Sequence, residues 1–377
     1  MDVTQYQGLF YLSMGLGVFV SMMLGLRLLA QRGSSIDVFE EDDLWLDVEP
    51  LEVIERIEEC TNVVTLRLRR RGDKRIPKFK AGQFLSLQIG DDEKVTRSYS
   101  ISSSTANRQN VQLSVKRLND GRGSTWVHHL KVGDEVKAYS PSGHFTDESL
   151  SDQPRVYIGG GIGITPLLSM IHSNIDAGNG VPMTLFYGMR TRQDLAFHSI
   201  LEAYAQRHSY FKYHPFLSHE MGEWPYQKGF LTFEEVVKKT SLDQRTHYFL
   251  CGPAAMTDAL IEQMSLADIP EEQIHIEKFV SPQTLDRTKI PSRSAKVVID
   301  DVAYSYSGQE TLLEFLEGKG ERIPYACRTG VCGSCKCRVQ GKTEMLTDAG
   351  LTRHDKAQGY VLTCVAFPAD AEVRLKR

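Results

Sequence analysis

The sequence has no large excess of charge of either sign. Its 44 lysines and arginines are set against 48 aspartates and glutamates, which leaves a formal net charge of −4 over 377 residues. A near-neutral total gives no electrostatic basis for binding nucleic acid. Internal repeats are also missing, and 41% hydrophobic with 24% charged residues excludes wholesale disorder and a collagen-like chain. At roughly 150 residues per domain, the length predicts two or three compact units.

Cysteine is scarce over most of the chain and gathers near its end. Of seven cysteines, Cys327, Cys332, Cys335 and Cys364 all lie beyond residue 326. An odd number so clustered indicates a metal or cluster site and not a disulfide framework. Their Cys-x4-Cys-x2-Cys…Cys spacing is that of plant-type [2Fe-2S] sites. Zinc, which favours paired Cys-x2-Cys steps, and reduced structural thiols are the alternatives.

The N-terminal region has no sign of a cleaved signal peptide, because no basic residue precedes Arg27 and no A-x-A site follows. Gly8–Leu26 carries no charge, and as a helix it would reach about 28 Å, close to the ~30 Å core of a bilayer. We therefore expect residues 1–35 to be a transmembrane anchor, with a buried core helix as the alternative. Arg27 and Arg32 then predict a single-pass protein of the inner or plasma membrane with cytoplasmic catalytic domains.

The rest of the chain divides into segments that differ in composition and in hydrophobic pattern. Residues 36–50 are acidic, contain no basic residue and predict a linker. Residues 51–150 alternate between apolar and polar positions and are broken by Gly, Asp and Asn turns, which predicts an antiparallel β-barrel. Residues 151–280 alternate strands with helices, which predicts an α/β domain with a parallel sheet. A Ser/Pro/Arg-rich linker over 281–295 precedes a third domain over 296–377.

Two strand ends in the α/β segment predict a nucleotide site. The glycine-rich run GGGIGITP follows an apolar strand and precedes a helix, the setting that a dinucleotide loop requires. Cys251 also ends an apolar strand, so both strand ends can converge on one ligand crevice. The residues expected to bind the cofactor here are Gly159, Gly160, Gly161, Gly163, Thr165, Pro166, Gly252 and Pro253.

At this point the chain resembles a known family. The run YACRTGVCGSC, from Tyr325 to Cys335, is similar to the cluster loop of plant-type ferredoxins, and the upstream motifs resemble the ferredoxin–NADP reductase superfamily. The order flavin, nicotinamide, ferredoxin resembles single-chain reductases that feed oxygenases, desaturases and hybrid-cluster proteins. With the anchor, this implies a multidomain fold: a transmembrane helix, an antiparallel β-barrel flavin domain, an α/β parallel-sheet nicotinamide domain and an α+β β-grasp ferredoxin domain.

The resemblance also implies roles for single residues. Arg97 would meet the flavin phosphate, since a guanidinium suits a phosphate bidentately. Ser100 would reach toward flavin N5, and Cys251 would lie beside the carbon that gives up hydride. Glu277 with Phe279 would form the closing E-x-aromatic motif. The expected catalytic residues are Ser100, Cys251, Glu277 and Phe279. The further flavin-binding residues are Ser98, Tyr99, Ser114, Val115, Lys116, Gly123 and Ser124. The Gly121–Ser124 loop favours FAD over FMN.

The adenosine half of the nicotinamide cofactor leaves an alternative open. Arg190 or Arg192 could accept a 2′-phosphate, whereas Asp194 could bind a 2′-hydroxyl. The sequence therefore does not decide between NADH and NADPH. Cys60 and Cys337 have no role in this interpretation.

Together these features predict an electron path from NAD(P)H to FAD to the [2Fe-2S] cluster and on to an external acceptor. We expect an oxygenase or a fatty-acyl desaturase; the alternatives are a soluble hybrid-cluster protein and, from another class, a non-enzymatic redox sensor or scaffold. Arg328, Lys336 and Arg338 lie near the cluster cysteines, which predicts a partner with an acidic docking face.

Overall fold

The computed structural model describes residues 45, 48–72, 74–90, 92–150, 152–240, 243–279 and 285–376. The chain divides into two units, Met1–Leu44 and Trp45–Arg377, and the description below concerns the second. The predicted transmembrane anchor and most of the acidic linker lie outside the described residues. Among the helices that are described, none has the length and apolar character needed to cross a membrane.

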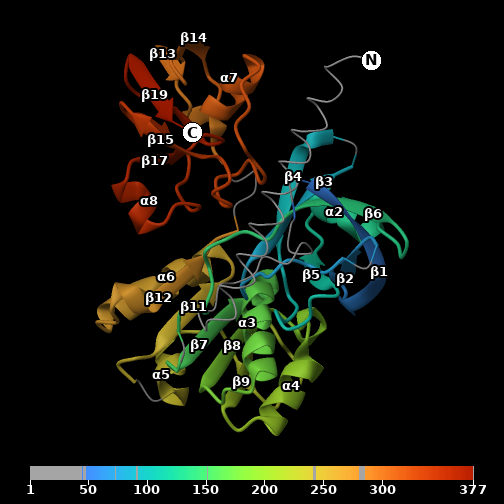
Figure 1. The fold of residues 1–377 in the computed structure, drawn as a ribbon. Coiled ribbons are helices and arrows are strands. Elements are labelled where there is room, and N and C mark those ends of the chain that lie inside the picture. Colours follow the sequence, from blue (N-terminus) through green and yellow to red (C-terminus); the bar gives the residue numbers. More distant parts are fainter. Residues whose placement is uncertain are drawn as a thin grey trace, which may run out of the picture. The chain divides into compact units, whose positions relative to one another are not determined.

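The first described domain is an antiparallel sheet of six strands in the order β4-β3-β6-β1-β2-β5 (Figure 1). An isolated bridge between Ile101, just after β4, and Leu113 in β5 joins the two ends of this order and closes the sheet, as the barrel prediction requires. One short helix, α2, crosses it. The elements are β1 (Val48–Cys60), β2 (Val63–Arg70), β3 (Phe84–Ile89), β4 (Asp92–Ser100), β5 (Val111–Lys116), α2 (Arg122–His129) and β6 (Glu135–Tyr139).

The barrel begins earlier than the sequence predicted. Strand β1 starts at Val48, inside the stretch expected to be linker. The buried indole of Trp45 explains this early start. Its Nε1 donates a hydrogen bond to the carbonyl of Ala138 on β6 (3.2 Å) and so fixes the chain three positions before the first residue of β1. The acidic composition concealed one residue that belongs to the barrel core.

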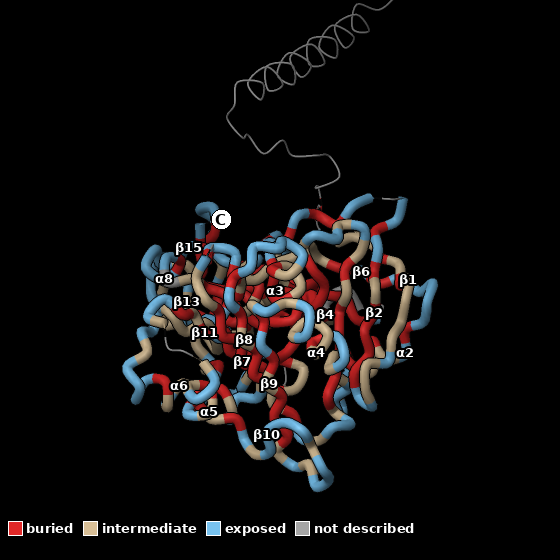
Figure 2. The backbone as a smooth tube through the Cα atoms, turned by 90° about the horizontal axis from the view of Figure 1, so that it is seen from below, coloured by how far each residue is buried: buried red, intermediate tan, exposed pale blue. Residues whose placement is uncertain are grey.

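The second domain is a parallel sheet in the order β10-β9-β8-β7-β11-β12, as predicted from the alternation of strands and helices. Residues of β7 alternate between its faces: Tyr157 enters one apolar core, and Val156 and Ile158 enter the other. Buried positions follow β7, β8 and β9 in Figure 2. The elements are β7 (Arg155–Gly160), α3 (Ile164–Ala177), β8 (Met183–Met189), α4 (His198–Arg207), β9 (Phe211–Leu217), β10 (Gln227–Lys228), α5 (Phe233–Lys239), β11 (His247–Cys251), α6 (Ala254–Leu266) and β12 (Ile274–Glu277).

A buried ion pair fixes the entry into this sheet. Arg155 opens β7, and its Nε lies 2.9 Å from Oδ2 of Asp147, in the segment that leads from the barrel. The same carboxylate oxygen accepts hydrogen bonds from the Tyr157 hydroxyl and from Nδ2 of Asn174 on α3, each 2.8 Å long. A buried charge pair is stable only with such additional partners, so Asp147 ties the connection, β7 and α3 together.

The third domain is a mixed sheet in the order β14-β13-β19-β15-β17, with a separate pair β16-β18. Only β13 and β19 pair in parallel among these strands. Strand β13 starts inside the predicted second linker. The elements of this domain are β13 (Arg293–Ile299), β14 (Val302–Gly308), α7 (Leu312–Gly318), β15 (Lys336–Gln340), β16 (Thr343–Met345), α8 (Arg353–Ala357), β17 (Tyr360–Leu362), β18 (Ala366–Pro368) and β19 (Glu372–Lys376).

Short 3-10 turns also occur among the described residues of the second and third domains and the segment between them. They are η2 (Gly161–Gly163), η3 (Arg192–Asp194), η4 (Glu271–Gln273) and η5 (Arg287–Lys289).

Candidate functional site

A cavity of about 420 Å³ is lined by residues of all three domains. Its size is that of a small-molecule or cofactor site. The barrel supplies most of the lining, the turn after β7 and the segment after β12 supply a smaller part, and the cysteine loop supplies Thr329. The lining residues are Arg97, Ser98, Tyr99, Ser100, Ser114, Val115, Lys116, Leu118, Asn119, Asp120, Gly121, Arg122, Gly123, Ser124, Ile162, Thr165, Phe279 and Thr329.

The sequence predicted much of this lining but not all of it. Every predicted flavin-binding residue is in the cavity wall, together with Ser100, Thr165 and Phe279. Asn119 and Asp120 lie outside every predicted motif; Leu118, Gly121, Arg122, Ile162 and Thr329 lie within predicted motifs but were not named individually as site residues. The turn around Asp120, which has φ +59°, could have been found from its position between two predicted motifs.

On the barrel side, strand β4 places a guanidinium and a phenol at the cavity. Burial lowers the pKa of Arg97 and raises that of Tyr99, so the phenol of Tyr99 stays neutral near pH 7. Gly123 at the start of α2 packs against both: a Cβ there would lie 2.6 Å from Cγ of Arg97 and 2.8 Å from the Tyr99 hydroxyl. The glycine is needed because the Arg97 and Tyr99 side chains already occupy the position of its Cβ, and this packing holds both side chains at the start of α2.

Two of the predicted hydroxyls are already engaged within the chain. Ser124 Oγ accepts the N–H of Leu118 and donates to the carbonyl of Gly121, each at 3.1 Å. Ser114 Oγ lies 2.8 Å from both Thr65 Oγ1 and Ser102 Oγ. These side chains therefore shape the loop and the strand. The N–H of Gly121 donates to the carbonyl of Leu118 (3.2 Å), so the N–H groups of the first turn of α2, Arg122–Ser124, are the ones suited to a pyrophosphate.

The glycine-rich turn after β7 meets the end of β11, as expected. A Cβ on Gly163 would lie 2.2 Å from the carbonyl oxygen of Cys251, and one on Gly252 would lie 2.6 Å from Met256. These glycines are thus required by the close approach of the two strand ends. Gly161 differs: it has φ +58° and open space around its Cβ position, so it is the glycine that presents bare backbone to a ligand.

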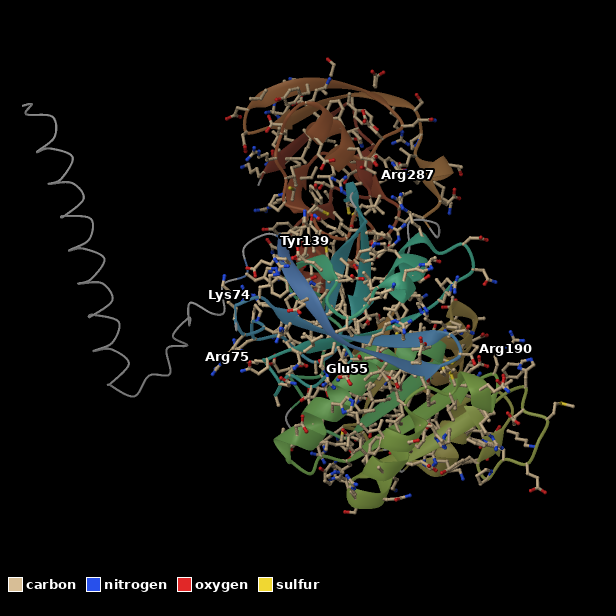
Figure 3. The ribbon with its side chains drawn as sticks, turned by 90° about the vertical axis from the view of Figure 1, so that its right-hand side faces the viewer. Glu55, Lys74, Arg75, Tyr139, Arg190 and Arg287 are labelled. Carbon is tan, nitrogen blue, oxygen red and sulfur yellow. The ribbon has the colours of Figure 1, made fainter. Side chains whose placement is uncertain are left out.

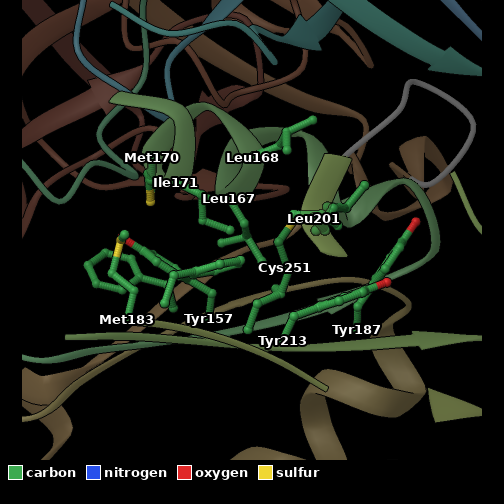
Figure 4. Close-up of a cluster of buried hydrophobic side chains, with 14 of the residues drawn as sticks. Tyr157, Leu167, Leu168, Met170, Ile171, Met183, Tyr187, Leu201, Tyr213 and Cys251 are labelled. Atoms are coloured by element: carbon green, nitrogen blue, oxygen red, sulfur yellow. The ribbon is translucent and has the colours of Figure 1, made fainter. Parts of the chain in front are cut away.

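Cys251 and Glu277 end neighbouring strands and are paired in the β11–β12 register. Cys251 is fully buried in the apolar cluster of Figure 4, and burial, then the nearby Glu277, raise the pKa of its thiol. The residue Glu277 is partly exposed, but its Oε2 is buried without a hydrogen-bond partner among the described residues, and this burial raises the pKa of the carboxyl to about 8. Glu277 is therefore mainly protonated at neutral pH.

The four expected ligand cysteines are all buried at one site in the third domain. Cys327 Sγ accepts the N–H groups of Thr329 and Cys332, each at 3.4 Å. Thiol–thiol contacts join Cys327 to Cys332 and Cys335 to Cys364, and the contact with Cys332 lowers the pKa of Cys327 to about 5. Cys337 lies outside these two pairs.

Two thiol pairs suit a two-iron cluster better than a single ion. In the described part of the chain, no three His, Cys, Asp or Glu side chains converge on a point where one metal ion would sit. Zinc needs such a point, whereas the iron atoms of a [2Fe-2S] cluster each take two thiolates. Gly330, with φ +75°, keeps the loop close to Thr347, whose Cγ2 would be 2.7 Å from an added Cβ.

Family comparisons agree with this geometry. The Oxidoreductase FAD-binding domain matches residues 50–146, the Oxidoreductase NAD-binding domain matches 157–261, and the 2Fe-2S iron-sulfur cluster binding domain matches 298–369. The glycine betaine monooxygenase reductase subunit of Pseudomonas aeruginosa is 30% identical over 313 residues, which are 77% of this chain and 85% of that protein. The chain belongs to the ferredoxin–NADP reductase family. It is an NAD(P)H-dependent oxidoreductase with FAD-binding and [2Fe-2S] domains.

Other relatives and structures share this domain order. A 1,2-phenylacetyl-CoA epoxidase subunit of Escherichia coli is 31% identical over 316 residues, or 78% of this chain and 88% of that protein. The fold of phthalate dioxygenase reductase matches with a TM-score of 0.59 at 24% identity, covering 88% of this chain and 98% of that one. An intact self-sufficient cytochrome P450 monooxygenase matches with a TM-score of 0.70 at 24% identity, over 87% of this chain and 41% of that one.

In this reductase the cysteine loop packs directly on the barrel. Thr96 on β4 donates a hydrogen bond to the carbonyl of Ala326, 2.7 Å away. Phe84 forms a buried apolar cluster with Ala326, Cys327 and Cys332. The pair Cys327–Cys332 therefore faces the barrel, next to the flavin cavity that Thr329 lines.

Two of the three basic residues near the cluster are paired within the chain. Arg328 forms an ion pair with Glu317 and stacks over Tyr325, with its guanidinium carbon 3.9 Å from the ring centre. Lys336 Nζ lies 2.7 Å from Oδ1 of Asp355. These two charges are compensated within the chain, whereas Arg338, the third residue of the predicted basic set, is exposed. The acidic docking face of the partner stays a prediction.

The predicted adenosine residues lie beyond the carboxyl end of β8. Asp194 Oδ2 accepts hydrogen bonds from the backbone N–H and the hydroxyl of Thr191, at 3.2 and 2.8 Å, so its carboxylate caps the turn η3. Arg192 donates to the carbonyl of Glu223 and stacks over Trp224 at 5.1 Å. Arg190 is exposed at the rim of the domain (Figure 3).

Proposed function

We propose that this chain is the reductase component of an oxygenase system, taking hydride from NAD(P)H and passing single electrons to an oxygenase. The observation that carries the proposal is the shared cavity: barrel residues, Thr165 of the nucleotide domain and Thr329 of the cluster loop all line it. Relatives at 30% and 31% identity are named as subunits of a monooxygenase and of an epoxidase.

The residues around the cavity have distinct tasks in this function. Arg97 and the N–H groups of Arg122–Ser124 would hold the phosphates of FAD, which when bound would convert the electron pair of a hydride into single electrons. Phe279, with 47% of its surface exposed, covers the cavity and must move aside for a nicotinamide ring. Cys251 and the neutral carboxyl of Glu277 do not line this cavity; they end the paired strands β11 and β12, and Glu277 lies two residues before Phe279. Because the pKa of each group is raised, both stay neutral near pH 7 and would place no charge at these strand ends when a nicotinamide binds.

Cys327, Cys332, Cys335 and Cys364 hold the cluster, which accepts one electron at a time. Because Cys327 and Cys332 pack against the barrel, the route from flavin to cluster stays within the protein. Packing of the cluster cysteines on the barrel keeps the cluster close to the flavin cavity, and their burial shields the cluster from solvent.

The decisive experiment is anaerobic stopped-flow reduction of the full-length holoenzyme by NADH or NADPH. We expect bleaching of the flavin band followed by bleaching of the cluster bands, and then reoxidation by an oxygenase captured from detergent-solubilised membranes. The Cys364→Ser variant is the control: it should retain rapid reduction of ferricyanide and lose electron delivery to the oxygenase. A cluster that stays oxidised while the flavin turns over would refute the path, and a holoenzyme without steady-state turnover would favour the redox-sensor alternative.

The membrane expectation belongs to the same proposal. We propose that Gly8–Leu26 anchors the reductase and so raises its effective concentration near a membrane-bound oxygenase or fatty-acyl desaturase. Removal of residues 1–35 should release the protein from the membrane fraction, leave ferricyanide reduction unchanged and impair reduction of a membrane partner. Equal reduction of the partner by both forms would instead favour a soluble acceptor such as a hybrid-cluster protein.

A further inference from the structure

The adenosine end of the nucleotide domain contains a carboxylate that neither the sequence analysis nor the family resemblance singled out. A cavity of about 620 Å³ opens beyond β8 and β9 and is lined by Thr191–Gln193 and His219–Glu223. In an open α/β sheet, ligands bind outside the carboxyl ends of the strands. With the nicotinamide half near Cys251, this cavity lies where the adenosine ribose reaches.

Glu220 is held at this cavity in a fixed position. Its Oε2 accepts the backbone N–H of Arg192 at 2.9 Å, and the N–H of Gly222 contributes a second contact. These bonds, led by that of Arg192, lower the pKa of Glu220, so the side chain is ionised at neutral pH. A carboxylate has about four acceptor positions, so it keeps capacity for a ligand hydroxyl.

Two cations, Arg192 and Lys228, lie near enough to Glu220 to lower the pKa of its carboxyl, but each donates to a backbone carbonyl, Lys228 to that of Gly222. The guanidinium of Arg192 donates a hydrogen bond to the carbonyl of Glu223 and stacks over the ring of Trp224. Asp194, the residue expected to bind a ribose hydroxyl, is engaged with Thr191. Asp194 also does not line this cavity, whose described acidic side chains are Glu220 and Glu223. Of these two, Glu220 is the one whose carboxylate is held by described contacts with backbone N–H groups.

We propose that Glu220 determines the choice of nicotinamide by accepting the ribose 2′-hydroxyl of NADH and repelling the 2′-phosphate of NADPH. A hydroxyl donates to a carboxylate, whereas a phosphate brings a second negative charge next to it. The inference deepens the proposed function, since it concerns the electron donor of the same reductase. It does not depend on which oxygenase receives the electrons.

The test is the ratio of kcat/KM for NADH to kcat/KM for NADPH, measured with the full-length holoenzyme and ferricyanide. One exposed charge near a phosphate predicts a ratio of about 10 or more for the native protein, and a fall of about tenfold in Glu220→Gln. Glu220→Lys should shift the preference toward NADPH. Glu262→Gln, which removes an exposed charge on α6, should leave the ratio unchanged.

The outcomes separate this inference from its rivals. A native preference for NADPH, or the same ratio in the native protein and Glu220→Gln, would overturn it. Arg192→Gln gives a second check: a selective loss of NADPH use would assign the site to a 2′-phosphate and overturn it as well. Both nicotinamides are compared in one preparation, so a poorly folded fraction cancels. Ferricyanide needs neither cluster nor oxygenase, so failure of the proposed function would leave this ratio measurable.

Discussion

Glu277 gives a prediction whose size follows from the structure. Its carboxyl, whose Oε2 is buried without a hydrogen-bond partner among the described residues, has a pKa raised by burial to about 8, whereas an ordinary glutamate has a pKa of 4.5. Between these two values the folded protein binds one proton more than the unfolded chain. The free energy of unfolding must then fall as pH rises through this window, by about 1.4 kcal/mol per pH unit.

The full effect is reached above about pH 8 and amounts to about 5 kcal/mol, from the difference between 4.5 and about 8. This is a ceiling, because Glu277 also borders a cavity of about 380 Å³ from which water can hydrate the carboxylate. Glu277→Gln keeps the shape of the side chain and cannot ionise. Relative to the native protein, the variant should therefore be only slightly changed near pH 5 and should gain stability as pH rises.

Thermal unfolding of the two holoenzymes from about pH 5 to about pH 8.5 tests this linkage, with flavin absorbance as a check on equal FAD content. For a domain of this size, about 1 kcal/mol corresponds to roughly 2–4 °C in Tm. We expect the difference in Tm to widen steadily with pH and to level off above about pH 8. Parallel curves across the whole range would refute the reasoning, because they would mean that Glu277 is already ionised in the folded protein.

Three further predictions concern other parts of the fold. Gly330→Ala should lose much of its iron and visible cluster absorbance while keeping FAD, because φ +75° alone costs about 1–2 kcal/mol and the new Cβ would also meet Thr347; full iron content would contradict this. Thr96→Val should slow cluster reduction in stopped-flow and leave ferricyanide activity unchanged, because it leaves the carbonyl of Ala326 unpaired at a cost of about 1–3 kcal/mol. An unchanged rate of cluster reduction would show that this hydrogen bond does not position the cysteine loop for electron transfer. Asp147→Asn should lower the free energy of unfolding by about 3–5 kcal/mol through the buried charge left on Arg155, and a Tm equal to that of the native protein would show that this charge finds another partner.

The fold was readable from the sequence where a local pattern determines structure. The alternation of apolar residues in Val111–Lys116 and the glycine-rich turn after Ile158 each depend on a few neighbouring residues, and the predicted barrel and parallel sheet are confirmed. The start of β1 was not readable. It depends on the contact between Trp45 and Ala138, which are separated by 93 positions in the chain.

The cavity shows the same division between local and long-range information. Arg97 and its neighbours on β4 were predictable because one short motif contains them. Thr329 was not, although it lines the same cavity, since its place depends on how the cysteine loop packs on the barrel. Glu220 was missed for a similar reason: it matters through the backbone N–H of Arg192, 28 positions away, and no spacing rule connects the two residues.

Charge is the property that the sequence predicted least well. Arg328 and Lys336 stand beside cluster cysteines in the chain, and proximity in sequence suggested a basic rim. In the fold, Glu317 and Asp355 approach them from α7 and α8 and cancel both charges locally. A screened pair exerts little force on a partner beyond a Debye length of about 8 Å at physiological ionic strength. The predicted acidic docking face therefore depends on Arg338, which is exposed, more than on Arg328 or Lys336, whose charges are compensated within the chain.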